Sequence, residues 1–217
     1  MNTSIIEQRR LPSPTQTPQA LAWRNGMLWM GSRDLRRIYE IDPQSWAVRQ
    51  EIDPPGIPWA AVSAGDHLWF TLGEGADDDR YVWRFTPGSG FDRSSRFACP
   101  DFTGSYLSYD GGHLYLSQWY KRRILQLGES GEIVRSINVG GEICGHTFVD
   151  GLIYVLRGEE SPNEEWSIAR LDPSQDTPEV TDLARVPFAS RSLTHDGEKF
   201  WSNHRAGNET MAFTLLD

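Results

Sequence analysis

The chain has 217 residues and a formal net charge of −9, and 38% of its residues are hydrophobic. An acidic protein repels phosphate backbones, so this charge balance argues against nucleic-acid binding. The opening residues MNTSIIEQRR contain no apolar core, and no run approaches the roughly 18 apolar residues of a membrane span. We therefore expect a cytoplasmic protein with no membrane partner.

A tight turn followed by an aromatic residue recurs five times along the chain. The aromatic residues are Trp29, Trp69, Tyr115, Tyr154 and Trp201, at spacings of 40, 46, 39 and 47 residues. The preceding turn residues are Asn25-Gly26, Gly65-Asp66, Gly111-Gly112, Asp150-Gly151 and Asp196-Gly197. A repeat of about 43 residues built from short β segments is typical of the blades of a β-propeller.

The first repeat shows how each blade is expected to form. Residues 20–24 are the predicted inner strand, and the Asn25-Gly26 hairpin turn connects them to a second strand at 27–31. Residues 37–41 are the predicted third strand, and 47–52 the outer strand. The sequence thus predicts an all-β, five-bladed β-propeller with four-stranded antiparallel blades. Its single domain, 1–217, divides into blades at about 17–55, 56–100, 101–140, 141–187, and 188–217 with 4–11.

The fifth repeat ends before its outer strand. Its predicted strands are 190–194, 199–203 and 210–215, and the given sequence then ends. Residues 4–10, ahead of the first repeat, are the expected missing strand. Pairing of this strand with the last blade closes the ring as a monomer and protects its open sheet edges. The alternative is a larger ring completed by dimerisation.

Comparison of the five repeats separates packing positions from candidate functional positions. Packing positions carry similar residues in every repeat, as in the columns Leu28, Leu68, Leu114, Ile153, Phe200 and Ile38, Val82, Ile124, Ile168, Met211. One column differs in every repeat and lies ten residues before the aromatic: Gln19, Trp59, Ser105, Cys144 and Arg191. A ligand has no five-fold symmetry, so this varied column marks the expected site.

The varied column lies at one end of the inner strands, on the face that also carries the loops between second and third strands. The predicted ligand-binding residues are Gln19, Trp59, Gln118, Trp119, Cys144, Arg157, Arg191 and Arg205. Arg presents a planar fork of donors and Trp a flat apolar wall, so the pattern predicts a small, anionic metabolite bound at the axial mouth. In the alternative interpretation these groups bond only to water and to neighbouring blades.

Two histidines are candidates for a general base. His146 replaces an apolar residue of the other repeats and follows Cys144 by two positions, so both lie on one face of a strand. His204 lies in a loop on the mouth face. The corresponding activity is a lyase or hydrolase, with Arg stabilising the developing negative charge. Alternatively, His146 is a hydrogen-bonded core residue, and we expect Cys99 and Cys144 to be free thiols.

Two of the longer loops between second and third strands are acidic. They contain Glu74, Asp77, Asp78 and Asp79 in the second repeat, and Glu159, Glu160, Glu164 and Glu165 in the fourth. Clustered carboxylates suit a hard cation, but this spacing matches no calcium-loop motif. We therefore expect a solvated acidic rim and no resident cofactor, with a divalent cation as the alternative. A scaffold that docks a basic protein through this rim is a third functional hypothesis.

The first repeat contains the segments Gln19-Ala20-Leu21-Ala22, Gly26-Met27-Leu28-Trp29 and Ile38-Tyr39-Glu40-Ile41-Asp42-Pro43. These segments resemble blades of the streptogramin (virginiamycin B) lyase group and, more loosely, of NHL-type and gluconolactonase-type propellers. The blade number is that of plant-type glutaminyl cyclases. The resemblance implies a propeller fold. It also implies a metal-assisted His/Glu site for the lyase group, but this sequence has no His-x-Glu or Glu-x-His group to match it.

Overall fold

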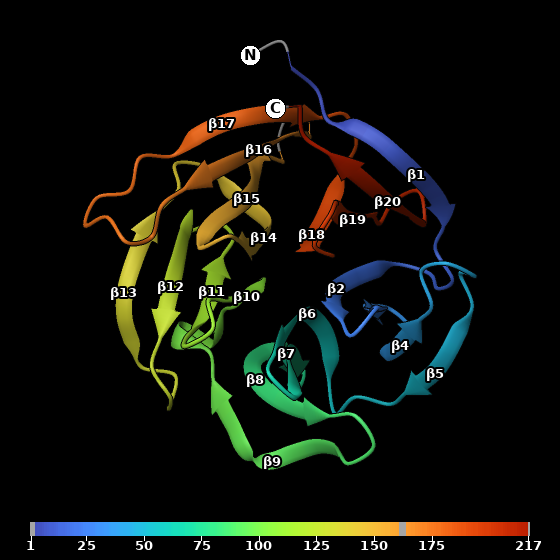
Figure 1. Cartoon of the computed structure of the whole chain (residues 1–217). Coiled ribbons are helices and arrows are strands. Elements are labelled where there is room, and N and C mark those ends of the chain that lie inside the picture. The colour runs from blue at the N-terminus through green and yellow to red at the C-terminus, as the bar shows by residue number, and fades with distance from the viewer. Residues whose placement is uncertain (1–2, 161–163, 217) are drawn as a thin grey trace.

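The computed structural model describes residues 3–160 and 164–216, which form five four-stranded antiparallel sheets arranged in a ring (Figure 1). The first blade contains β2 (Pro18–Arg24), β3 (Met27–Ser32), β4 (Arg37–Ile41) and β5 (Val48–Ile52). The second contains β6 (Ile57–Ala64), β7 (His67–Glu74), β8 (Asp79–Thr86) and β9 (Gly90–Ala98). A short 3₁₀ helix, η1 (Pro100–Phe102), leads into the third blade.

The third blade contains β10 (Leu107–Tyr109), β11 (Leu114–Gln118), β12 (Arg123–Leu127) and β13 (Ile133–Asn138). The fourth contains β14 (Glu142–Val149), β15 (Leu152–Glu159), β16 (Glu165–Leu171) and β17 (Thr181–Val186). The fifth contains β18 (Ser190–His195), β19 (Phe200–His204), β20 (Glu209–Thr214) and, from the other end of the chain, β1 (Ile6–Pro12). The predicted all-β, five-bladed propeller is confirmed.

Hairpin turns set where the first two strands of a blade begin and end. In the Asn25-Gly26 turn the φ angles are +49° and +80°, and in the Asp150-Gly151 turn they are +51° and +78°. A type I′ turn needs this left-handed backbone at both positions, and Asn, Asp and Gly adopt it at the lowest cost. The Asn-Gly and Asp-Gly pairs that recur in the sequence are therefore the residues that this turn backbone requires.

An aspartate in two of these turns also holds the aromatic residue that follows. The Asp196 side chain accepts hydrogen bonds from two backbone N–H groups and from Trp201 Nε1, the last at 2.7 Å. Asp110 accepts in the same way from its own turn and from Tyr115 Oη at 3.1 Å. One carboxylate thus connects the turn to the packed second strand of the blade.

The hydrophobic core lies between neighbouring blades. Every residue of the column Ile38, Val82, Ile124, Ile168 and Met211 is buried, at no more than 1% exposure. Trp29 of the first blade contacts Phe85 of the second, with ring centroids 5.6 Å apart. Each large side chain buried in this way contributes about 1.5–3 kcal/mol, so the repeated column supplies much of the energy that holds the blades together.

The N-terminal segment contacts two blades. Strand β1 pairs antiparallel with β20, from Ile6 opposite Thr214 to Pro12 opposite Glu209. Just before it, the Ile5 N–H donates to the Arg185 carbonyl at 3.1 Å, and the Arg185 N–H donates to the Thr3 carbonyl at 2.9 Å. These bonds attach the segment to the fourth blade as well as the fifth, and the Ile5 side chain is buried between them.

Along the central axis of the ring, side chains from the inner strands pack against one another. Leu21, Leu107 and Leu193 from three inner strands are buried there, together with His146. The inner strands are therefore in contact below the mouth, and only their ends are open to a ligand. No helix in the described parts of the chain is long and apolar enough to cross a membrane.

Candidate functional site

Most of the inner strands carry a local irregularity where they reach the mouth. The strand pairing skips Gln19 in β2, Trp59 in β6 and Cys144 in β14. In β18 the pairing shifts between Arg191 and Thr194. A β-bulge leaves one residue out of the ladder and redirects its side chain, which is why bulges occur beside binding sites. Three of the five residues of the varied column therefore lie at bulges, and a fourth, Arg191, borders one.

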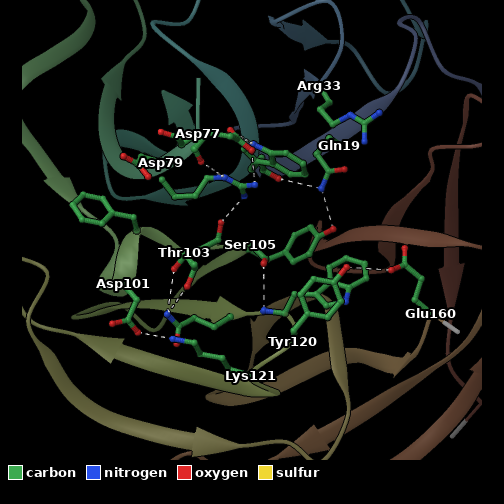
Figure 2. Close-up of a pocket in the computed structure, with 18 of the residues that line it drawn as sticks. Gln19, Arg33, Asp77, Asp79, Asp101, Thr103, Ser105, Tyr120, Lys121 and Glu160 are labelled. Carbon is green, nitrogen blue, oxygen red and sulfur yellow. Dashed lines mark hydrogen bonds and ion pairs between the residues drawn. The ribbon is translucent and has the colours of Figure 1, made fainter. Parts of the chain in front are cut away.

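A cavity of about 630 Å³, here called the mouth cavity, opens at this end of the ring (Figure 2). Inner-strand ends, loops between second and third strands, and the η1 segment all contribute to it. Its lining residues are Gln19, Arg33, Trp59, Asp77–Arg80, Asp101–Tyr106, Gln118–Lys121, Glu160 and Arg205. Five of the predicted ligand-binding residues are among them: Gln19, Trp59, Gln118, Trp119 and Arg205.

Arg205 is the cation of this cavity that lacks an anionic partner. Its side chain is half-buried, and Nη1 donates to Gln19 Oε1 at 2.6 Å. No carboxylate of the described residues lies within ion-pair distance of its guanidinium. Burial lowers the pKa of Arg205, and the positive charges of Arg191 and Arg33 lower it further. Arg205 therefore has no direct carboxylate partner among the described residues, although its charge contributes to lowering the pKa of Asp34.

Gln19 connects Arg205 to a buried tyrosine. Its Nε2 donates to Tyr106 Oη at 2.9 Å, and the same amide group lies 3.5 Å from the Trp59 carbonyl. Gln19 is only 1% exposed and Tyr106 3% exposed, although both border the cavity. Burial raises the pKa of Tyr106, so its hydroxyl stays protonated. The result is a row of polar groups, Arg205, Gln19 and Tyr106, along one wall.

A second wall is built around Trp59. The Arg80 guanidinium lies over its ring, 3.8 Å from the centroid, and Trp59 Nε1 donates to Asp78 Oδ1 at 3.1 Å. Arg80 also forms an ion pair with Asp78 at 2.7 Å and donates to the Gly104 carbonyl at 3.0 Å. Burial lowers the pKa of Arg80, and Asp78 opposes that effect. These contacts hold the Trp59 ring in place.

The third blade supplies a wall in which each polar group has a partner. Gln118 donates to the Pro100 carbonyl at 2.9 Å and to Thr103 Oγ1 at 2.8 Å, and its Oε1 accepts from Arg123. Lys121 forms an ion pair with Asp101 at 2.6 Å. Figure 2 shows Asp101 and Lys121 at one edge of the cavity and Tyr120 and Glu160 at another.

Arg191 lies behind this wall and not in it. Its side chain is 5% exposed, forms ion pairs with Glu160 and Glu164, and is covered by the rings of Trp119 and Trp166. Burial opposes its charge, but surrounding groups that include Glu164 raise the pKa of Arg191 overall. Arg191 is thus placed as a packed and compensated charge, outside the described residues that line the cavity.

Cys144 and Arg157 also lie outside that lining. Cys144 is fully buried, and burial raises the pKa of its thiol. Arg157 forms an ion pair with Asp182 at 2.8 Å and donates to the Val139 carbonyl, which directs it toward the packing between blades. Both cysteines are free thiols. Cys99 is buried too, which raises its pKa to about 12.

His146 is a hydrogen-bonded core residue. It is 1% exposed, its Nδ1 lies 2.7 Å from Ser108 Oγ, and its Nε2 lies 3.2 Å from the Tyr106 carbonyl. Burial lowers the pKa of His146 to about 4, so the ring is neutral near pH 7. Both ring nitrogens are already engaged, and the Cys144 thiol is held in its protonated form. The pair is therefore not poised for nucleophilic catalysis.

His204 lies near the rim of the fifth blade, where its Nδ1 is 3.1 Å from Glu209 Oε2. It is not among the described residues that line the cavity. Of the acidic loop residues, Glu74 bonds to Arg96 and to Trp83 Nε1, while Asp77 and Asp79 face the cavity. Within residues 3–160 and 164–216, no group of three His, Cys, Asp or Glu side chains is placed to hold a metal ion.

Two important lining residues, Tyr106 and Arg80, were missed by the sequence reasoning. Tyr106 directly follows Ser105, the third-repeat member of the varied column, and precedes the first residue of β10. In that blade, both Ser105 and its neighbour Tyr106 line the cavity. Arg80 directly follows the acidic run at Asp77–Asp79. Its position next to these aspartates could have predicted the ion pair that Arg80 forms with Asp78.

The sequence matches no protein-family model and no curated protein. Three of the solved structures that are similar to this chain illustrate the shared fold. A glutaminyl cyclase from Myxococcus xanthus has a TM-score of 0.75 and 13% identity, over 99% of this chain and 98% of that chain. Regucalcin from Agrobacterium tumefaciens, described as a calcium-binding protein, has a TM-score of 0.63 and 10% identity, over 99% and 96%.

The third is virginiamycin B lyase from Staphylococcus aureus, with a TM-score of 0.57 and 18% identity, over 95% of this chain and 69% of that chain. All three identities are low, so these likenesses show the β-propeller fold, consistent with the resemblance of the first repeat. Propellers of one architecture carry different activities, so the function of this chain has to be argued from its own side chains.

Proposed function

We propose that the mouth cavity binds a small, anionic metabolite. The observation that supports this most directly is Arg205, a half-buried guanidinium at the cavity wall with no carboxylate of the described residues beside it. Removing a charge from water is costly unless it is paired, so such a cation is stabilised when an anion enters the cavity. Arg also binds carboxylates and phosphates with paired hydrogen bonds.

The size and lining of the cavity support a small molecule as the ligand. Its volume of about 630 Å³ is within the usual range of small-molecule pockets, and its lining mixes aromatic rings with a few fixed polar groups. Arg80 and Lys121 already have carboxylate partners, Asp78 and Asp101. Arg205 is therefore the residue expected to hold the anion.

This proposal assigns no catalytic step. The two candidate bases, His146 and His204, both lie outside the described lining, and His146 is enclosed in the core. The acidic rim remains a candidate contact for a basic protein, but most of its carboxylates already bond to arginine side chains. Ligand binding is thus the function that the described side chains support best.

The test compares binding of simple carboxylates by the parent protein, Arg205→Met and Arg93→Met. Arg93 is exposed on outer strand β9, so its replacement removes the same charge far from the cavity. Isothermal titration is expected to show binding about tenfold weaker for Arg205→Met and unchanged for Arg93→Met. Equal losses in both variants, or binding unaffected by Arg205→Met, would show that the cavity is not the anion site.

A further inference from the structure

We propose that the ligand of the mouth cavity is an aromatic carboxylate, a flat ring that carries an anionic group. This inference rests on the proposed function and specifies its ligand class. It is carried by two features: the unused hydroxyl proton of Tyr106, and the aromatic side chains that gather around the cavity.

The orientation of the Gln19 amide determines what the wall offers to a ligand. A guanidinium can only donate hydrogen bonds, so the amide oxygen of Gln19 must face Arg205, at 2.6 Å. The amide nitrogen then faces Tyr106 Oη, at 2.9 Å, and donates to it. The Tyr106 hydroxyl is therefore already an acceptor, and its own proton has no acceptor among the hydrogen bonds of the described residues.

A buried donor without a partner points to a group that the protein does not supply. Tyr106 is only 3% exposed and borders the cavity, so its proton is available to an acceptor inside. Arg205 offers further N–H groups on the other side of Gln19. A carboxylate has two acceptor oxygens and no donor, which suits these two donors together.

The surface next to these donors is aromatic. The Tyr106 and Trp119 rings have centroids 6.3 Å apart, and Trp119 and Tyr120 are 5.9 Å apart. Tyr120 is 74% exposed, and Phe102, another lining residue, is 48% exposed. Large exposed side chains gathered at one cavity mark a binding surface more often than a solvated one. Aromatic rings attract one another in offset or edge-to-face arrangements beyond the area they bury, so exposed rings at the rim favour a ligand that carries a flat ring.

Trp59 adds a fixed aromatic surface from the second blade. One face of its ring is covered by the Arg80 guanidinium, and its indole N–H is bonded to Asp78. The ring is thus immobilised before any ligand arrives, which lowers the entropy lost on binding. Aromatic side chains from the second and third blades therefore line a space that also borders Arg205 of the fifth blade and the Tyr106 hydroxyl of the third.

The first test compares four probes of graded chemistry by isothermal titration: benzoate, cyclohexanecarboxylate, acetate and benzyl alcohol. Benzoate and cyclohexanecarboxylate share the charge and differ in the ring. We expect benzoate to bind about three- to tenfold more tightly than cyclohexanecarboxylate, and more tightly still than acetate. Benzyl alcohol keeps the ring without the charge and is expected to bind at least about tenfold more weakly than benzoate.

The second test uses variants of the two features. Tyr106→Phe keeps the ring and removes the donor, and is expected to weaken benzoate about tenfold. Tyr120→Ala removes an exposed ring and is expected to weaken benzoate about threefold or more while leaving acetate unchanged. Leu35→Ala is the control, since Leu35 is 47% exposed on the β3–β4 loop and outside the cavity lining.

The outcomes separate this inference from the proposed function. If benzoate and cyclohexanecarboxylate bind equally, and Tyr120→Ala has no effect, the aromatic specificity is wrong. The proposed function survives that result when both probes still depend on Arg205. If no carboxylate binds in an Arg205-dependent way, the proposed function and this inference fail together. Should Tyr106→Phe fail to fold, the benzoate series and Tyr120→Ala still decide the question.

Discussion

Arg191 and Arg205 come from the same blade, and they illustrate two different uses of a charge at the mouth of the ring. Arg191 is 5% exposed and enclosed by Glu160, Glu164 and two Trp rings. Arg205 borders the cavity and contacts the neutral amide of Gln19. Arg191, on the fourth-blade side of the mouth, is thus packed and paired with carboxylates, whereas Arg205, on the cavity side, has no carboxylate partner among the described residues. A residue that differs from its equivalents in the other repeats has a role of its own, but its contacts determine whether that role is structural or in binding.

The packed side depends on the N-terminal segment, and its removal is expected to have the largest effect. Deleting residues 1–11 removes most of β1 and the Ile5 side chain, and it exposes the edge of β20. An unpaired edge strand promotes aggregation, so we expect loss of the cooperative unfolding transition, measured by circular dichroism on heating. A truncated protein that unfolds as cooperatively as the parent would contradict this role of the segment.

Arg191→Met tests whether the compensated charge is structural. It leaves Glu160 and Glu164 without their partner and removes the contact with the Trp rings. Because these carboxylates are partly exposed, the loss is expected at the lower end for a buried pair, about 3 kcal/mol of unfolding free energy by urea titration. Arg205→Met is the matched control, with an expected loss below about 1 kcal/mol. Equal losses would remove the distinction between the two residues.

His146 gives the packed centre of the ring a dependence on pH. Its pKa is lowered by burial from 6.5 to about 4, so between these values the unfolded chain binds a proton that the folded protein does not. Acidification from pH 6.5 to pH 5 is therefore expected to cost about 2 kcal/mol of stability through this residue. In His146→Gln, the unfolding free energy from urea titrations should fall less steeply as the pH is lowered. An unchanged slope would show that His146 does not titrate in this way.

Gln19→Glu gives Arg205 a carboxylate partner within the protein, as Arg191 already has. Of these changes it has the smallest expected effect on stability. A glutamate of the same shape accepts from both Arg205 and Tyr106, which satisfies both donors internally. We expect a gain of about 1 kcal/mol in unfolding free energy together with loss of carboxylate binding. Gln50→Glu serves as the control, because Gln50 is exposed on outer strand β5 and lies outside the described lining of the cavity. Carboxylate binding that survives Gln19→Glu would contradict the role of Arg205 and Tyr106.

The fold could be predicted because its signals are local. The Asn25-Gly26 and Asp150-Gly151 turns encode their own backbone, and the repeated apolar columns mark the packing between blades. The inner and second strands of the first blade were expected at 20–24 and 27–31 and are found at Pro18–Arg24 and Met27–Ser32. Each of these features is set by residues close together in the sequence.

The candidate site was predicted in position but not in detail. The varied column identified the mouth, since three of its five members lie at β-bulges and three of them line the cavity. Which of the predicted residues face the cavity depends on partners from distant segments: Glu164 pairs with Arg191, and Asp182 pairs with Arg157 away from the cavity. Tyr106 was missed because the comparison of repeats selects one position in each blade, whereas Ser105 and Tyr106 both line the cavity just before β10.

The most direct test of the central claim is a crystal structure of the protein with para-bromobenzoate, using the anomalous signal of bromine to place the ring. The account predicts bromine density in the mouth cavity beside Trp119 or Tyr120, with the carboxylate bonded to Arg205 and Tyr106. Bromine located only outside this cavity, or a bound carboxylate directed away from Arg205, would contradict it.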